Sequence, residues 1–224
     1  MGIFFILILL ITLGFSVILH EIAHGAVADR LGDPTARLAG RLTLNPISHI
    51  DLFWTILLPI FLVVMHSPII FASAKPVPYN PYNLRNPRSG SLFIGLAGPF
   101  TNIALAAFFG ILYQVISMPF AAGIANEGIF LLLRFGVMIN AILATFNLLP
   151  VPPLDGSKAL FAIFPGIPSS VQRFLEQFGI IIVFLIVLAA NSLILIPARF
   201  IFMAATGLPA QEFINTFVKV LGAF

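Results

Sequence analysis

The stretch GIFFILILLITLGFSVILHEIAH, residues 2–24, decides the class of this protein, because an apolar run leads directly into two histidines and a glutamate. A run of about 18 apolar residues is long enough to cross the ~30 Å hydrocarbon core of a bilayer as a helix. A cleavable signal peptide would have a shorter apolar region followed by a small-residue cleavage site. We therefore interpret residues 2–28 as a retained membrane span.

The composition of the whole chain agrees with a membrane protein. Of 224 residues, 60% are hydrophobic and 8% are charged, and the mean hydropathy is +1.10. There are no cysteines, which excludes disulfides, a thiol nucleophile and a cysteine zinc site. The net charge is +3, but the eleven Lys and Arg residues are scattered between apolar segments and form no run that could follow nucleic acid. Positive loops beside a membrane explain this charge.

Further apolar segments predict an all-α polytopic protein with about six transmembrane or re-entrant helices. The expected spans are residues 2–28, 52–72, 91–117, 128–149 and 174–190, with a proline-interrupted sixth at 193–205. Residues 210–224 are amphipathic and are expected to lie along the interface. Neither an internal repeat nor a flexible linker is visible. We expect one domain over residues 1–224, with a catalytic core at about 1–165 and accessory helices at about 166–224.

One segment does not fit a helix. Residues 37–50, RLAGRLTLNPISHI, alternate apolar and polar side chains around Gly40 and Asn45-Pro46. This pattern predicts a small β-hairpin-like element. An extended segment or an ordinary connecting hairpin is the alternative.

HEIAH has the spacing of a metal site. On a helix, His20 and His24 lie on one face and can direct both imidazoles at one ion, while Glu21 can act as a base. Zinc suits such ligands and activates water for hydrolysis. In a soluble helix this pattern is ambiguous, but an ionisable group within a span costs about 2.5–3.5 kcal/mol on insertion scales. The alternative is that the span ends near Leu19 and these residues lie among the lipid headgroups.

A catalytic zinc usually has a third protein ligand. Asp155, in NLLPVPPLDG (residues 147–156), follows an apolar span in a proline-stiffened segment and is the best candidate. An ordinary Asp-Gly turn is the alternative. Asp51 is a competitor, and His49 beside it is interpreted as a structural residue.

Three motifs in order, HEIAH, LAGPFTN (residues 96–102) and NLLPVPPLDG, together resemble the site-2 protease family of intramembrane zinc metalloproteases. GRLTLNPISHID (residues 40–51) and AKPVPYNPYNLRNP (residues 74–87) resemble stretches of its short members, which lack PDZ and CBS domains. The likeness covers most of residues 14–160.

This resemblance implies a zinc endopeptidase that hydrolyses peptide bonds within or near transmembrane segments of membrane-protein substrates, as in regulated intramembrane proteolysis. It implies one Zn²⁺ held by His20, His24 and Asp155, with Glu21 as the base. It also places Asn102 and Asn147 near the site, where they would hold substrate or the tetrahedral intermediate; interhelical hydrogen bonding is the alternative for both.

The expected partners are a transmembrane-helix substrate and the lipid bilayer, with no nucleic acid; the oligomeric state stays open. The expected location is a prokaryotic cell membrane. Cations after the first and fourth spans put the site near the cytoplasmic face. If residues 52–72 crossed only once, Asp155 would lie across the bilayer from His20, so residues 52–89 must bring the chain back.

Two other functions remain open from the residues alone. A transporter or channel could use the intramembrane His, Glu and Asp as an ion pathway, although many transporters show internal repeats and an ion path needs no HExxH spacing. A catalytically dead scaffold would not be expected to keep His20, Glu21, His24 and Asp155. For a protease, movement of the fifth and sixth spans is the predicted gate.

Overall fold

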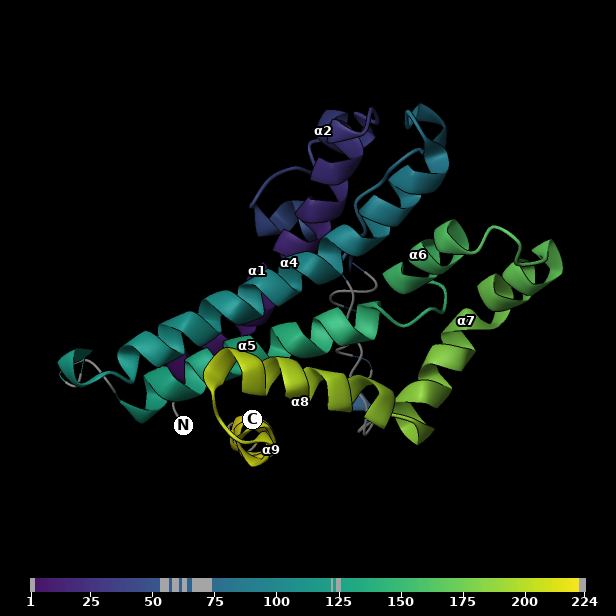
Figure 1. The fold of residues 1–224 in the computed structure, drawn as a ribbon. Helices are drawn as coiled ribbons and strands as arrows, with labels where there is room; N and C mark the ends of the chain where they lie inside the picture. The colour runs from purple at the N-terminus through teal and green to yellow at the C-terminus, as the bar shows by residue number, and fades with distance from the viewer. Residues whose placement is uncertain are drawn as a thin grey trace.

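The computed structural model describes residues 3–52, 57, 61, 64–65, 74–121, 123 and 126–221. Within these ranges the chain forms helices and irregular segments, with no strand (Figure 1). The elements are α1 (Ile3–Arg30), α2 (Thr35–Leu38), η1 (Pro46–His49), η3 (Pro81–Asn83), α4 (Pro87–Ile116), η4 (Pro119–Ala121), α5 (Glu127–Asn147), α6 (Asp155–Ile163), α7 (Ser169–Ala189), α8 (Ser192–Thr206) and α9 (Ala210–Leu221), the η elements being 3-10 helices.

Helices α1, α4, α5 and α7 are each long and apolar enough to cross a membrane. They correspond to the expected first, third, fourth and fifth spans. The expected sixth span forms α8, which is bent by 101° against α9, and this pair counts as at most one further span. The predicted span at residues 52–72 falls largely outside the described residues. The part of the chain that is described therefore gives four or five spans.

Close packing in the centre joins α4 and α5 to the other helices. The apolar core includes Leu131 and Val137 of α5 and Phe202 of α8, all at most 1% exposed. A Cβ on Gly110 would lie 2.5 Å from the carbonyl oxygen of Ala205, so α4 and α8 can approach only because this position carries no side chain. By contrast, α7 stands to one side in Figure 1, and only 6% of its apolar window is buried inside the protein.

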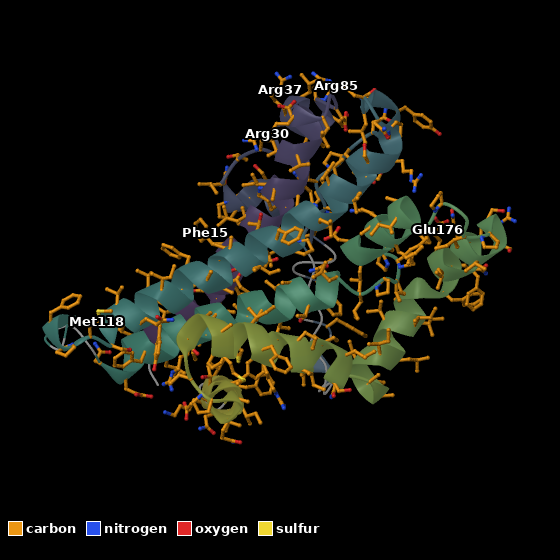
Figure 2. All side chains as sticks on the ribbon, in the orientation of Figure 1. Phe15, Arg30, Arg37, Arg85, Met118 and Glu176 are labelled. Carbon is orange, nitrogen blue, oxygen red and sulfur yellow. The ribbon has the colours of Figure 1, made fainter. Side chains whose placement is uncertain are left out.

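The chain leaves α1 and enters α4 at the same end of the molecule. Arg30, Arg37 and Arg85 lie at one end of the molecule in Figure 2, and the N–H of Arg85 donates to the carbonyl of Leu31 at 3.1 Å. The N–H of Lys75 likewise donates to the carbonyl of His49 at 2.9 Å. The segment between residues 50 and 74 thus starts and ends at one place. The topology conflict noted above is removed, whatever path that segment takes.

The hairpin expected over residues 37–50 is not found. Arg37 and Leu38 end α2, Gly40 turns the chain with φ +65°, and η1 occupies Pro46–His49. The side chain of Asn45 accepts a hydrogen bond from the N–H of Ile47 at 3.1 Å, which caps the 3-10 helix. An Asn side chain bonded to its own backbone, followed by a proline with fixed φ, favours a turn over a ladder. The alternation of apolar and polar residues was therefore misleading.

Candidate metal centre

Three ligand atoms from distant parts of the chain converge inside the protein. The Nε2 atoms of His20 and His24 lie 3.1 Å apart, and Oδ2 of Asp155 is 3.1 Å from the first and 3.0 Å from the second. The three residues are 6–7% exposed. A tetrahedral ion with ligands at about 2.0–2.1 Å has ligand-to-ligand edges of roughly 3.3 Å. Among the described residues, this is the one group of His, Asp and Glu whose ligand atoms lie close enough to hold a metal ion.

Local structure explains how these atoms meet. His20 and His24 are one turn apart on α1, so their rings share a face. Asp155 is the first residue of α6, so Asp155 and Gly156 open a helix and do not form the Asp-Gly turn that was the alternative to a ligand. A Cβ on Gly156 would lie within 2.5 Å of the backbone of Leu148 and Leu149. The missing side chain lets α6 begin directly against the end of α5, and this puts the carboxylate beside the histidines.

The hydrogen bond at Nδ1 of each histidine ring determines that Nε2 is the nitrogen free to bind a metal. Nδ1 of His20 lies 2.6 Å from Oδ1 of Asn102, and Nδ1 of His24 lies 2.6 Å from the carbonyl oxygen of Ile94. Both partners are acceptors, so each Nδ1 carries the hydrogen and each Nε2 presents its lone pair to the centre of the group. Histidine ligands of zinc are commonly held in this way.

Gly98 of α4 leaves space at the same point. A Cβ at this position would lie 2.5 Å from Nε2 of His20 and 2.5 Å from Nε2 of His24. The side-chain position of residue 98 therefore coincides with the space between the two ligand nitrogens. This space, with two imidazoles and one carboxylate around it, fits a zinc ion.

Asp155 presents one oxygen to the histidines and the other to a lysine. Nζ of Lys158 donates to Oδ1 at 2.9 Å, while Oδ2 faces the two Nε2 atoms. Lys158 also lies over the ring of Tyr79, 5.6 Å from its centre. The lysine was not singled out from the sequence, although its position three residues after Asp155 on a helix was a usable signal.

Glu21 follows His20 on α1 and is half-buried. Its Oε2 accepts a hydrogen bond from the backbone N–H of Val77 at 2.9 Å. A carboxylate is thus held beside the ligand group by a segment 56 residues away in the chain.

Comparison with known proteins shows which family this chain belongs to. The model of peptidase family M50 matches residues 111–190. The "Putative zinc metalloprotease YwhC" of Bacillus subtilis (strain 168) is 36% identical over 178 residues, which cover 78% of this chain and 77% of that protein. The chain belongs to peptidase family M50. The "Putative zinc metalloprotease MJ0611" of Methanocaldococcus jannaschii is 32% identical over 157 residues, 69% of each chain. No solved structure matches the M50 chain.

Membership in M50, the site-2 protease family, makes this protein an intramembrane zinc metalloprotease. The zinc metalloprotease names of its relatives and the apolar spans agree with that function. The transporter or channel alternative is set aside.

A series of buried hydrogen bonds extends from Asn102, the partner of His20, in the M50 protease. The amide nitrogen of Asn102 donates to Oδ1 of Asn140 at 2.8 Å, and the amide nitrogen of Asn140 donates to the hydroxyl of Ser16 at 2.9 Å. The hydroxyl of Ser16 then donates to the carbonyl of Thr12 at 2.8 Å. Ser16 and Asn140 were missed from the sequence. A serine one turn before His20 and an amide within an apolar span were the available signals.

The remaining expected residues are not among the three whose ligand atoms converge. The amide nitrogen of Asn147 donates to the carbonyl of Leu143 within α5 at 3.0 Å, so its described contact is with its own helix. His49 is buried and Nε2 bonds to the carbonyl of Thr43 at 2.8 Å, as expected of a structural residue. Asp51 is not part of the group that could hold a metal.

Proposed function

We propose that this M50 protease binds one catalytic zinc through His20, His24 and Asp155 and uses Glu21 as its general base. The convergence of the three ligand atoms at 3.0–3.1 Å supports this assignment. Zinc, when bound, supplies a Lewis acid that lowers the pKa of water and polarises a carbonyl. Glu21 takes a proton from the attacking water and later passes it to the leaving amine.

The substrate class follows from the depth of the site. His20 lies ten residues before the end of α1 at Arg30, about 15 Å along the helix axis. We propose peptide bonds within or near transmembrane segments of membrane proteins as the substrate, cleaved in regulated intramembrane proteolysis. Such bonds are already paired within a helix, so the substrate must unwind locally before it is cut.

The two asparagines receive different roles in this proposal. Asn102 supports catalysis through His20, because its side-chain oxygen is engaged at Nδ1 of that ring. Asn147 is half-buried in the last turn of α5, eight residues before Asp155, and we propose it as a substrate contact.

The charge distribution supports an active site near the cytoplasmic face. Arg30, Arg37 and Arg85 gather at the end of the molecule where α1 ends, far from Met118 (Figure 2). Of these, Arg37 is paired with the carboxylate of Asp29 at 3.0 Å, whereas Arg134 near the other end is paired with two carboxylates, Glu127 and Glu212, at 2.8–2.9 Å. An excess of cations marks the cytoplasmic side of a membrane protein. The bacterial and archaeal relatives support a prokaryotic cell membrane.

The exposure of α7 supports its movement as the gate for substrate. Val183 and Val187 pack against the cluster that contains Leu149 and Leu154, next to Asp155. The rest of α7 is mostly exposed, so little apolar surface inside the protein opposes its displacement.

The deciding experiment compares the wild type with Glu21→Gln, both reconstituted in liposomes with a fluorescently labelled single-span substrate. We expect Glu21→Gln to keep stoichiometric zinc by mass spectrometry and to lose cleavage. Glu176→Gln, an exposed change on α7 (Figure 2), is the matched control and should keep both. Unchanged cleavage by Glu21→Gln, or no zinc in the wild type, would overturn the proposal.

A further inference from the structure

An irregular segment, residues 74–80 with the sequence AKPVPYN, lies against the part of α1 that carries Glu21. We call this segment the strap. Val77 in its middle is 7% exposed. The N–H of Val77 donates to Oε2 of Glu21 at 2.9 Å. The segment therefore contacts the proposed base directly. This contact involves none of the three proposed zinc ligands.

The sequence of the strap limits which backbone group can make this bond. Pro76 and Pro78 have no N–H, so Val77 carries the one backbone donor between residues 76 and 78. Proline also fixes its own φ and pushes the preceding residue toward an extended conformation. The donor is thus placed in a stiff stretch of chain where no neighbouring N–H competes for the carboxylate.

A second contact holds the same residue against the same face of α1. A Cβ on Gly25 would lie 2.8 Å from Cγ1 of Val77, so the glycine makes room for this side chain. Gly25 is one helical turn after Glu21 and therefore lies on its face of the helix. The N–H of Val77 bonds to Glu21, and the side chain of Val77 packs against Gly25. Together these two contacts fix the position of the N–H donor along the axis of α1.

Both ends of the strap are tied to elements other than α1. At one end, Arg41 donates to the carbonyl of Lys75 at 2.6 Å, next to the bond between Lys75 and His49. At the other end, the N–H of Asn80 donates to Oδ2 of Asp33 at 2.6 Å, and Asp33 is fully buried. The donor is held from both sides, so its position is set before any substrate arrives.

We propose that the strap is a positioning element for the base, in which the Val77 N–H fixes one carboxylate oxygen of Glu21 and leaves Oε1 to receive the proton from water. Val77 is a positioning residue and touches no reacting atom. The inference rests on the proposed role of Glu21 as the base. A general base must lie within about 2.6–3.2 Å of the proton donor, and a misplacement of about 1 Å can cost about 100-fold in rate.

The test removes the N–H and keeps the rest of the residue. Val77→Pro has no donor, whereas Val77→Ala keeps the donor and serves as the matched control. We expect Val77→Pro to lower kcat about 10- to 100-fold with unchanged KM and zinc content. Val77→Ala should keep most of the wild-type kcat. A merely structural role would instead alter KM, zinc content and thermal stability together.

An independent readout needs no activity. The chain has four glutamates, Glu21, Glu127, Glu176 and Glu212, so carboxyl ¹³C NMR of glutamate-labelled protein gives four signals. The Glu21 signal is the one lost in Glu21→Gln. We expect it to move in Val77→Pro and to stay in place in Val77→Ala, with or without zinc.

If Val77→Pro fails to fold, an ester in place of the amide at residue 77, introduced as the hydroxy acid of valine, removes the same N–H with the side chain intact. Wild-type kcat and an unmoved Glu21 signal in whichever variant folds would overturn the proposed strap. Full cleavage by Glu21→Gln would overturn the base itself, so the two failures are distinguishable.

Discussion

His20 and Asn102 meet across the contact between α1 and α4, with Nδ1 of the ring 2.6 Å from the amide oxygen. Asn102 is 0% exposed, and its amide nitrogen is occupied by Asn140. The asparagine cannot turn without losing a buried hydrogen bond. The orientation of the His20 ring is therefore set by residues on α4 and α5 as well as by α1.

The hydrogen bonds that connect His20, Asn102 and Asn140 predict a loss of metal affinity when Asn140 is truncated. Asn140→Ala removes the closer acceptor of the Asn102 amide nitrogen and leaves the carbonyl of Ser16, 3.4 Å away, so we expect zinc affinity to fall about 10- to 100-fold. Competition with a chromophoric chelator measures it. The control is Thr145→Val, on the same helix, because the Thr145 hydroxyl bonds to α5 carbonyls only. Wild-type zinc affinity in Asn140→Ala would mean that the hydrogen bond between Asn140 and Asn102 does not help to hold the His20 ring.

The space at Gly98 predicts that a single methyl group excludes the metal. In Gly98→Ala the new Cβ would lie 2.5 Å from each ligand nitrogen, so we expect loss of bound zinc and of cleavage. Mass spectrometry of the purified protein gives the zinc content. Gly14→Ala, where a Cβ on α1 meets nothing within 4 Å, should keep full zinc. Stoichiometric zinc in Gly98→Ala would show that the ion lies elsewhere.

Lys158 is predicted to keep Asp155 in its ligand geometry. Lys158→Met removes the donor from Oδ1, which frees the carboxylate to rotate, and we expect about tenfold weaker zinc binding. Lys158→Arg keeps a charged donor and should restore part of the affinity. The same chelator competition measures both variants. Equal affinities for Met and Arg at this position would contradict a role for the charge.

Asp33 predicts a pH-dependent stability outside the membrane spans. Burial alone would raise the pKa of the Asp33 carboxyl, but hydrogen bonds from Thr35, Asn83 and the N–H of Asn80 outweigh burial, so the pKa lies below its ordinary value. A carboxyl whose pKa is lower when folded stabilises the protein above its unfolded pKa of about 3.9. This stabilisation is lost as the pH falls through the folded pKa.

Asp33→Asn should therefore unfold more easily than the wild type at pH 7, by about 2 kcal/mol. The difference should shrink below about pH 4. Thermal unfolding in detergent between pH 7 and pH 3 measures it. A difference that does not change with pH would show that the charge of Asp33 contributes nothing to this stability.

The proposed gate predicts that fixing α7 stops turnover. The chain has no cysteines, so a cysteine pair that joins Val183 of α7 to the cluster containing Leu154 can be cross-linked without interference. We expect the cross-link to suppress cleavage at least tenfold, to leave zinc unchanged, and to be reversed by a reducing agent. The two single-cysteine variants are the controls. Undiminished cleavage after complete cross-linking would place the substrate path elsewhere.

The local features of this protein could be read from its sequence. The length and hydropathy of each apolar run predicted α1, α4, α5, α7 and α8, because a membrane span depends on its own residues. The spacing of His20 and His24 predicted a shared face, because i and i+4 always meet on a helix. Residues 37–50 were predicted wrongly from the same kind of local pattern, since a cap at Asn45 outweighed the alternation.

The tertiary structure alone decided which atoms meet. The sequence proposed Asp155 as a ligand, but its 3.0–3.1 Å approach to the histidines depends on how α6 packs against α4 and α5. No sequence motif marks the Asn140 amide or the Val77 N–H as part of the site, because many apolar spans and proline-rich loops contain such groups. Their partners are fixed by contacts between residues 38 to 124 positions apart, and packing of the whole chain determines those contacts.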